Sequence, residues 1–348
     1  MAELAVIAPG LVSTIQDFGR FGWRELGVPV AGALDPVGLR LANALVGNPG
    51  GMAGIEICYR GPTLRVEADS VRLAVCGPAR LRLSAGDGAT RTFAADRSHR
   101  LTRGDVLEIG GLSGASVATL AVSGGFDLPP VLGSLSTAVR AGIGPLGGRP
   151  LAAGTLLPLC RAAAPDGPDL ALAEPMDYGE GPVRVVMGPQ ADHFTEEALA
   201  AFLSQSFTIG RESDRMGLRL EGPILRHKGG ADIPSDGLVS GCIQVPGSGA
   251  PIILLADHQT VGGYAKIATV ISADLPRLGR MMPGSRIGFA QVTVEAAEAA
   301  RRALESAVMR KIAGLRRLGG GEFIDLSALY DSNLVSGVVD MRREGEGG

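Results

Sequence analysis

The sequence lacks several features that would point to a particular class of partner. Aromatic residues make up only 4% of the 348 residues, the net charge is −3, and Lys and Arg form no long run. Binding to nucleic acid normally depends on clustered positive charge, so no nucleic-acid partner is expected. Gly, by contrast, is abundant at 52 residues, which favours many turns and close packing of small side chains.

Motifs for several cofactors and catalytic groups are also missing. There is no G-x-x-x-x-G-K-[ST] nucleotide loop and no G-x-S-x-G turn for a catalytic serine. The four histidines lack the spacing of metal ligands, so no metal site is expected. One stretch, "GIGPLG" at 142–147, satisfies G-x-G-x-x-G, but it contains Pro145 and no helical pattern follows, so it is interpreted as a turn.

Segments for export or membrane insertion are not evident. The start, "MAELAVIAPG", has no basic stretch before a long apolar one, and no run approaches the roughly 20 apolar residues of a membrane span. The four cysteines lie far apart without a C-x-x-C pair, which is typical of free thiols in a reducing compartment. We therefore expect a soluble, cytoplasmic protein.

The chain shows the same order of elements twice, a helix followed by short strands. Asp35, Pro36 and Gly47 mark the start and end of a first helix, and Thr195 marks the start of a second. Short β-like runs follow each, such as "VRLAVCG" and "ARLRLS" in the first half and "PIILLAD" and "AKIATVI" in the second. This pattern is typical of sandwiches and barrels, and a chain of this length is expected to form two domains.

The patterns therefore predict a mainly β fold with few helices. A first β domain, a Pro-rich linker, a second β domain, a C-terminal helix and a tail are expected over residues 1–160, 161–182, 183–295, 296–318 and 319–348. The apolar stripe of the C-terminal helix has helical spacing and consists of Ala297, Ala300, Leu304, Val308, Ile312 and Leu315.

Two Asp–Arg pairs stand beside glycines near predicted strand boundaries. Asp17 and Arg20 belong to "STIQDFGRFGW" at 13–23, and Asp214 and Arg215 belong to "ESDRMGLRLEG" at 212–222. One interpretation is that each pair only orders its own loop. The other is that each Arg holds a carboxylate or phosphate through two hydrogen bonds while the Asp orients it.

Polar residues also stand at predicted strands in the second half. Gln244 alternates with apolar neighbours, so its amide is either a satisfied core group or a ligand contact. The stretch "DHQTVGGYAKIATVI" at 257–271 is either a tight turn or the rim of a binding site. As a rim it offers groups for proton transfer, neutral hydrogen bonds, a glycine pair that can form an anion nest, and a lysine: Asp257, His258, Gln259, Thr260, Gly262, Gly263, Tyr264 and Lys266.

Several stretches resemble one protein family over most of the chain, from about Pro9 to Glu295. They are "TIQDFGR", "GVPVAGALDP", "LANALVGNP", "GGFDLPPVLGSLST", "SDRMGLRLEG", "GCIQVP" and "LLADHQTVGGYAKIATVISADLPRLGRMMPG". By these motifs the chain resembles the family of the 5-oxoprolinase C subunit (PxpC/KipA). That family includes allophanate hydrolase subunit 2 and the A–B part of the biotin-dependent carboxyltransferase domain of urea carboxylase.

The resemblance implies a fold and an assembly. The fold is two tandem cyclophilin-like β-barrel domains, like subdomain A over 1–160 and like subdomain B over 183–295, plus the C-terminal helix. The assembly is a hetero-oligomer with a companion B subunit (PxpB/KipI-like) and an A subunit (PxpA-like). Such a complex is an ATP-dependent hydrolase that opens the lactam of 5-oxoproline to L-glutamate. The ATP need not be bound by this chain, which alone is expected to be inactive or nearly so.

Two alternatives remain within the resemblance. The first is a carboxyltransferase or allophanate hydrolase-type subunit, which needs biotin on a separate carrier because this chain has no biotin-carrying lysine motif. The second is a KipA-like regulatory protein that antagonises an inhibitor of a histidine kinase and has no catalytic role.

Matching motif positions imply two sets of site residues. The catalytic set is Asp17, Arg20, Asp214, Arg215, Asp257 and Lys266, in which the basic residues hold oxygens and the acids orient them or transfer protons. The substrate-binding set is Gln244, Gln259, Thr260, Gly262, Gly263 and Tyr264. The chain departs from the family at Ala31, where Ser is common, and at Leu135, where Arg is common. If these positions touch substrate, the substrate or the activity of this chain differs.

Overall fold

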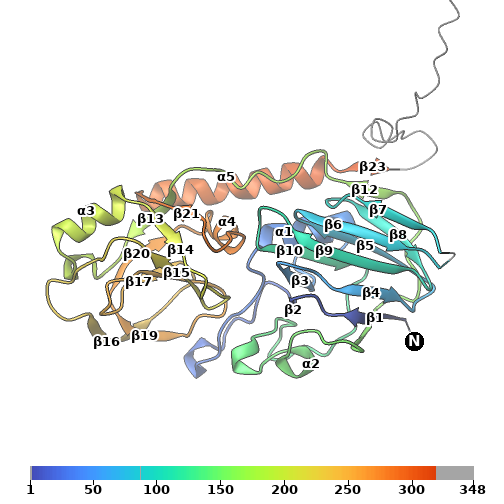
Figure 1. Ribbon diagram of the computed structural model, residues 1–348, viewed down its shortest axis with the longest axis horizontal. Coiled ribbons are helices and arrows are strands. Elements are labelled where there is room, and N and C mark those ends of the chain that lie inside the picture. Colours follow the sequence, from blue (N-terminus) through green and yellow to red (C-terminus); the bar gives the residue numbers. More distant parts are fainter. Residues whose placement is uncertain (1, 87, 319–348) are drawn as a thin grey trace, which may run out of the picture.

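Two barrels lie side by side in the computed structural model, which describes residues 2–86 and 88–318 (Figure 1). We call the two sheets that contain β1 to β11 the first barrel. The eight-stranded sheet that contains β13 is the second barrel. The predicted mainly β fold with a C-terminal helix is confirmed. The tail predicted over 319–348 lies outside the described residues.

The first barrel consists of a six-stranded sheet in the order β11-β1-β4-β9-β6-β7 and a five-stranded sheet in the order β2-β3-β10-β5-β8. Its strands are β1 (Glu3–Ala8), β2 (Val12–Gln16), β3 (Gly54–Cys58), β4 (Thr63–Val66), β5 (Ser70–Cys76), β6 (Ala79–Ser84), β7 (Thr90–Phe93), β8 (Ser98–Thr102), β9 (Val106–Leu112), β10 (Val117–Val122) and β11 (Leu156–Pro158).

Strand register gives this barrel two distinct faces. One row of paired residues, Ile15, Ile55, Leu120 and Val75, belongs to its aliphatic core. Because side chains alternate along a strand, the next row points outward, and it consists of Thr14, Glu56, Thr119 and Cys76. Glu56 is therefore the acidic member of this outward row, on the outer face of the five-stranded sheet.

The second barrel has the strand order β21-β14-β15-β18-β17-β20-β13-β22. Its strands are β13 (Val183–Met187), β14 (Phe207–Ile209), β15 (Gly217–Glu221), β17 (Cys242–Gln244), β18 (Ile252–Leu254), β20 (Lys266–Val270), β21 (Arg286–Ile287) and β22 (Phe289–Gln291). Its core contains an aromatic cluster, in which the Phe289 ring centroid lies 4.4 Å from that of Phe202 and 5.7 Å from that of Phe207.

A separate two-stranded ribbon extends from the second barrel. It pairs β16 (Asp232–Gly237) with β19 (Val261–Tyr264), and we call it the β16–β19 ribbon. It projects at the lower edge of the barrel in Figure 1. Leu238, directly after β16, is buried against Cys242 and Leu254, so the base of the ribbon packs on the outer face of β17 and β18.

The helices are α1 (Pro36–Leu45), α2 (Pro145–Gly148), α3 (Glu196–Ser204), α4 (Leu275–Gly279) and α5 (Val294–Ala313), with short 3₁₀ turns at Arg24–Leu26, Val139–Ala141 and Ala191–His193. The predicted helix starts are confirmed, because the side chains of Asp35 and Thr195 accept hydrogen bonds from backbone N–H groups of α1 and α3. In α2, Leu146 and Gly147 have φ values of 56° and 69°, so this segment is a left-handed turn, as the sequence predicts.

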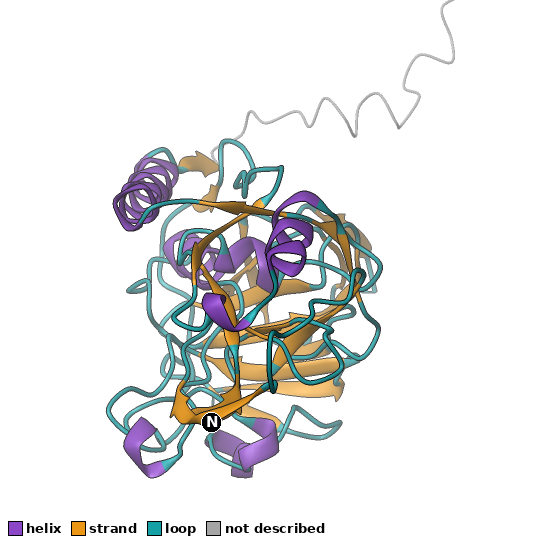
Figure 2. Ribbon diagram, turned by 90° about the vertical axis from the view of Figure 1, so that its left-hand side faces the viewer, coloured by secondary structure: helices purple, strands orange, loops and turns teal. Residues whose placement is uncertain are grey.

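The predicted C-terminal helix and linker differ from the observed elements. Helix α5 ends at Ala313 because Gly314 caps it, and residues 316–318 leave the helix to form β23 (Arg316–Leu318). This strand pairs with β12 (Asp169–Ala171) in the middle of the predicted linker, which is therefore packed on the first barrel rather than free. Helix α5 runs along both barrels in Figure 1, and Figure 2 shows it almost end-on, outside the curving strands.

Candidate functional site

Arg215 joins the two barrels. It lies in the turn before β15, where Gly217 lets the chain pass close to β18, since a Cβ there would lie 2.7 Å from a backbone oxygen. The Nε and Nη2 atoms of Arg215 donate to the two carboxylate oxygens of Asp257 at 2.9 and 2.8 Å. Nη1 donates to Glu56 in β3 of the first barrel, and Nη2 also donates to the carbonyl of Gly32 at 2.7 Å. We call these groups the Arg215 clasp.

The charged groups of the Arg215 clasp are almost completely buried, with 12% of the Arg215 side chain, 7% of Asp257 and 1% of Glu56 exposed. Burial raises the pKa of Glu56, which the Arg215 guanidinium and the backbone N–H of Leu34 oppose. Burial lowers the pKa of Arg215, but the two carboxylates outweigh it and the net shift is upward. All three Arg215 nitrogens have protein acceptors, so in this structure the clasp holds the barrels together.

The first predicted pair, Asp17 and Arg20, orders a loop beside the clasp. The carboxylate of Asp17 accepts hydrogen bonds from the Ser134 hydroxyl and the Leu135 N–H, both at 2.7 Å. Arg20 is 1% exposed, and its Nη2 donates to the carbonyl of Ser136. Burial lowers the pKa of Arg20, while the charges of Asp17 and Asp257 raise it. Its Nη1 has no hydrogen-bond partner among residues 2–86 and 88–318, so one buried donor is left over.

Asp214, next to Arg215, forms a more exposed contact between the barrels. Its Oδ2 accepts a hydrogen bond from Nη2 of Arg140 at 2.7 Å, and its Oδ1 accepts one from the N–H of Met216 at 2.8 Å. The side chains of Arg140 and Asp214 are 70% and 42% exposed, so solvent screens this ion pair.

His258 and its neighbours line a small pocket between the barrels. The pocket has a volume of about 200 Å³, and its lining includes Asp257, His258 and Gln259 with Pro29 and Arg140 of the first barrel. Burial lowers the pKa of His258, whose Nδ1 lies 2.5 Å from the carbonyl oxygen of Gln259. The imidazole is therefore neutral near pH 7 and able to accept a proton.

Lys266 and Gln244 form a second group of polar side chains on the outer face of the second barrel. They are paired residues of β20 and β17, so their side chains lie on the same face. Nζ of Lys266 donates to Oδ2 of Asp236 in β16 at 2.6 Å, and Oε1 of Gln244 accepts a hydrogen bond from Nε2 of Gln259 at 3.5 Å. We call these four residues the Lys266 group. Residues 257–266 run directly from the Arg215 clasp to this group.

The remaining predicted residues lie along the same stretch. Gly262 and Gly263 are part of strand β19, with extended pairing to β16, so they do not adopt the turn conformation that an anion nest requires. Gly262 instead allows close packing, because a Cβ there would lie 2.7 Å from Nε2 of Gln244. The carbonyl of Thr260 accepts a hydrogen bond from the N–H of Leu238, which fixes the base of the ribbon.

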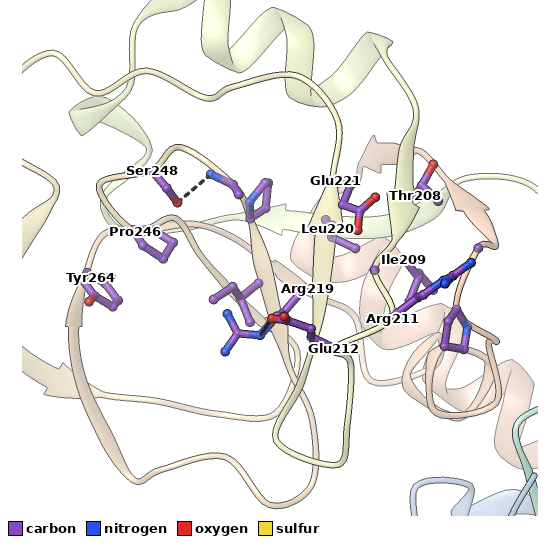
Figure 3. Close-up of a pocket in the computed structure, with 16 residues that line it drawn as sticks. Thr208, Ile209, Arg211, Glu212, Arg219, Leu220, Glu221, Pro246, Ser248 and Tyr264 are labelled. Atoms are coloured by element: carbon purple, nitrogen blue, oxygen red, sulfur yellow. Dashed lines mark hydrogen bonds and ion pairs between the residues drawn. The ribbon is translucent and has the colours of Figure 1, made fainter.

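Tyr264 alone of the predicted residues faces a separate cleft on the second barrel, which has a volume of about 980 Å³ (Figure 3). Figure 3 shows Tyr264 on one side of this cleft and Thr208 and Glu221 on the other. An ion pair of 3.8 Å between Arg219 and Glu212 lies within it. The cleft thus carries both charge signs and lies apart from the clustered predicted residues.

Sequence reasoning missed two acids of this region. Glu56 stands in the apolar run "GIEICY", where a single acid in a buried strand is itself a signal for a buried cation. Asp236 stands in "SDGLVSG", a stretch with the composition of a turn, and nothing in its sequence neighbourhood points to Lys266.

The structure offers no group of three or more His, Cys, Asp or Glu side chains placed to hold a metal within the described ranges. Among the same residues, no helix is long and apolar enough to cross a membrane. The cysteines at positions 58, 76, 160 and 242 are all free thiols.

Comparisons with known proteins agree with this architecture. The family described as carboxyltransferase domain, subdomains A and B, matches residues 26–291. The C subunit of 5-oxoprolinase from Escherichia coli K12 is 36% identical over 301 residues, which are 86% of this chain and 94% of that protein. The protein of the same name from Haemophilus influenzae is 36% identical over 294 residues, 83% of this chain and 91% of that protein.

A solved structure shows the same fold within a much larger protein. The crystal structure of the urea amidolyase of K. lactis has a TM-score of 0.81 and 28% identity over 93% of this chain. This chain spans only 20% of that protein.

Proposed function

The chain belongs to the family of the carboxyltransferase domain, subdomains A and B, and from this premise we propose that it is the C-type subunit of a 5-oxoprolinase. In this proposal it works with companion B-type and A-type subunits in a complex that opens the lactam of 5-oxoproline to L-glutamate. ATP drives the reaction and is bound outside this chain. A cytoplasmic location belongs to the same proposal, because the reaction depends on ATP.

One observation carries the proposal. Two proteins that bear the name of the 5-oxoprolinase C subunit are each 36% identical to this chain and are covered over more than nine tenths of their own length. The family match over residues 26–291 spans most of both barrels and includes every member of the Arg215 clasp and of the Lys266 group. The departures at Ala31 and Leu135 do not remove any member of the Arg215 clasp or of the Lys266 group.

The geometry divides the proposed roles between two sets of residues. Arg215 and Glu56 act as positioning residues, because they hold the barrels in register and fix Asp257. Lys266, Gln244 and Gln259 offer the ammonium and amide groups that bind an anionic or amide oxygen of the substrate. The neutral imidazole of His258 beside Asp257 is placed to accept and return a proton during ring opening.

Reconstitution tests the proposal. The chain is co-expressed with its B-type and A-type companions, and release of glutamate from 5-oxoproline is measured with and without ATP. We expect ATP-dependent release by the complex and little or none by the chain alone. A folded complex that releases no glutamate would remove the 5-oxoprolinase assignment.

A second candidate is carboxyl transfer, which the fold shared with the K. lactis urea amidolyase favours. That activity needs a biotinylated carrier protein, so it makes a different prediction. Product formation that depends on an added biotinylated carrier, and not on the A-type companion, would identify carboxyl transfer rather than lactam opening as the function.

A further inference from the structure

The ion pair between Lys266 and Asp236 joins a buried cation to an exposed anion. The side chain of Lys266 is 4% exposed, whereas that of Asp236 is 55% exposed. A buried ammonium needs a partner to remain charged. Asp236 supplies it from the β16–β19 ribbon, most of whose β16 residues are exposed.

A second donor beside this pair has no partner. Gln244 is 3% exposed, and its Nε2 makes no hydrogen bond to any group that the structure describes. Its other amide atom, Oε1, accepts from Gln259, which fixes the N–H₂ group away from that side. Gly262 leaves this N–H₂ group room, since a Cβ there would lie 2.7 Å from Nε2. Burying an unpaired donor is costly, so a site with one is incomplete without an acceptor.

We propose that Lys266 and Gln244 form a binding subsite for a carboxylate group, and that Asp236 occupies this subsite as an internal substitute until the ligand arrives. A bound carboxylate has two oxygens, of which one accepts from the Lys266 ammonium and the other from the Gln244 amide. Exchange of the Asp236 carboxylate for that of the ligand keeps Lys266 paired throughout. The ligand carboxylate also accepts a hydrogen bond from the Gln244 N–H₂ group, which Asp236 leaves unpaired.

The inference rests on the proposed function for the identity of the ligand, since 5-oxoproline carries one carboxylate next to its lactam. The chemistry of the subsite itself selects a broader class of ligand, the compact carboxylates. A compact carboxylate fits, because it replaces one carboxylate by another. A neutral ester or amide of the same shape does not fit, because it would leave the buried ammonium without a counter-charge.

The test measures the affinity of the full chain for 5-oxoproline by calorimetry or NMR titration. Asp236→Asn removes the internal competitor and keeps the size of the side chain, so we expect it to bind 5-oxoproline at least about tenfold more tightly than the wild type. Asp232→Asn is the matched control, because Asp232 lies on the same strand, is exposed and makes no ion pair among the described residues. It should leave the affinity unchanged.

Two further measurements make the test specific to the subsite. Adding Lys266→Met to Asp236→Asn should abolish the gain, and the methyl ester of 5-oxoproline should show no gain in any variant. Asp236→Ser serves as a second variant if Asp236→Asn folds poorly. An unchanged or weaker affinity in both Asp236 variants would overturn the inference, as would an equal gain in Asp232→Asn or an equal gain for the ester.

The outcome is separable from that of the proposed function. A gain in affinity without glutamate release by the complex keeps the subsite and removes the 5-oxoprolinase activity. Glutamate release without a gain in affinity keeps the activity and removes Asp236 as the occupant of the subsite.

Discussion

The Arg215 clasp and the Lys266 group are both buried and charged, yet they are built in opposite ways. In the clasp, all three guanidinium nitrogens of Arg215 have acceptors, and both carboxylates are buried with it. In the Lys266 group, the anion Asp236 is largely exposed and the amide N–H₂ of Gln244 is unpaired within the part of the chain that the structure describes. The clasp is complete without a ligand, and the Lys266 group is not.

The difference separates a structural role from a binding role. A saturated buried network gains nothing from a ligand, and removing one member leaves the others with unpaired charges. An unsaturated group with an exchangeable partner gains hydrogen bonds when a ligand enters. Stability should therefore depend on the clasp, and ligand binding should depend on the Lys266 group.

The largest effect should follow Arg215→Met. It leaves Glu56 and Asp257 buried without their cation, which should destabilise the chain by about 3–5 kcal/mol, as measured by urea unfolding. Arg140→Ala, which breaks only the exposed pair with Asp214, is the control and should cost at most about 1 kcal/mol. Equal losses in the two variants would contradict the structural role of the clasp.

Lys266→Met should change stability little and activity strongly. It removes the buried ammonium but leaves only an exposed partner behind, so stability should change by no more than about 1 kcal/mol. In the reconstituted complex, glutamate release should fall by about 10²–10³-fold, as expected for a lost charged donor. A large loss of stability with retained activity would assign Lys266 to the structural class instead.

The two adjacent glycines of β19 offer a finer comparison. In Gly262→Ala the new Cβ meets Gln244 Nε2 at 2.7 Å, whereas in Gly263→Ala the nearest atom is a backbone oxygen at 3.4 Å. We expect Gly262→Ala to lower glutamate release by about tenfold through displacement of the amide, and Gly263→Ala to change it little. If both variants behave alike, the position of Gln244 does not matter for activity.

The last comparison concerns stability in acid. The hydrogen bond from Lys266 holds the pKa of Asp236 below its usual value of 3.8. The pair therefore contributes stability above pH 3.8 and loses it as the pH falls through the lower folded pKa. Wild-type chain should be more stable than Asp236→Asn at neutral pH, and the gap in urea midpoint should close on acidification.

The contribution of Glu56 to stability should depend on pH in the opposite direction. Burial raises its folded pKa above 4.5, so its contribution is present below that pH and is lost as the pH rises through the folded value.

For Asp236, the contradicting outcome is a stability gap between wild type and Asp236→Asn that widens in acid. Such a gap would show that Asp236 is not held in its charged form.

Local signals in the sequence predicted local structure well. Asp35 and Thr195 cap the helices that their positions predict, and the alternation in "GIEICY" gives β3 with Glu56 facing outward. The stretch 257–266 was also recognisable, since its polar residues directly precede an apolar strand. The helix end at Ala313 was not, because β23 forms only through pairing with β12.

Partnerships over long distances in the chain could not be predicted in this way. Arg215 contacts Glu56 across 159 positions, and only the packing of two barrels brings them together. Gln244 faces Lys266 through a register shift in the β17–β20 pair, and a shift of one residue would turn one side chain to the opposite face. Residue types indicated the candidate site residues, whereas strand register and the packing of the two barrels determine which of these residues share a site.

The most direct measurement is a crystal structure of the chain assembled with its companion subunits and 5-oxoproline. We predict the ligand carboxylate within hydrogen-bond distance of Lys266 Nζ and Gln244 Nε2, with Asp236 displaced and the Arg215 clasp unchanged. An intact Lys266–Asp236 pair with the ligand bound elsewhere, or a carboxylate held by Arg215 in place of Asp257, would contradict the account.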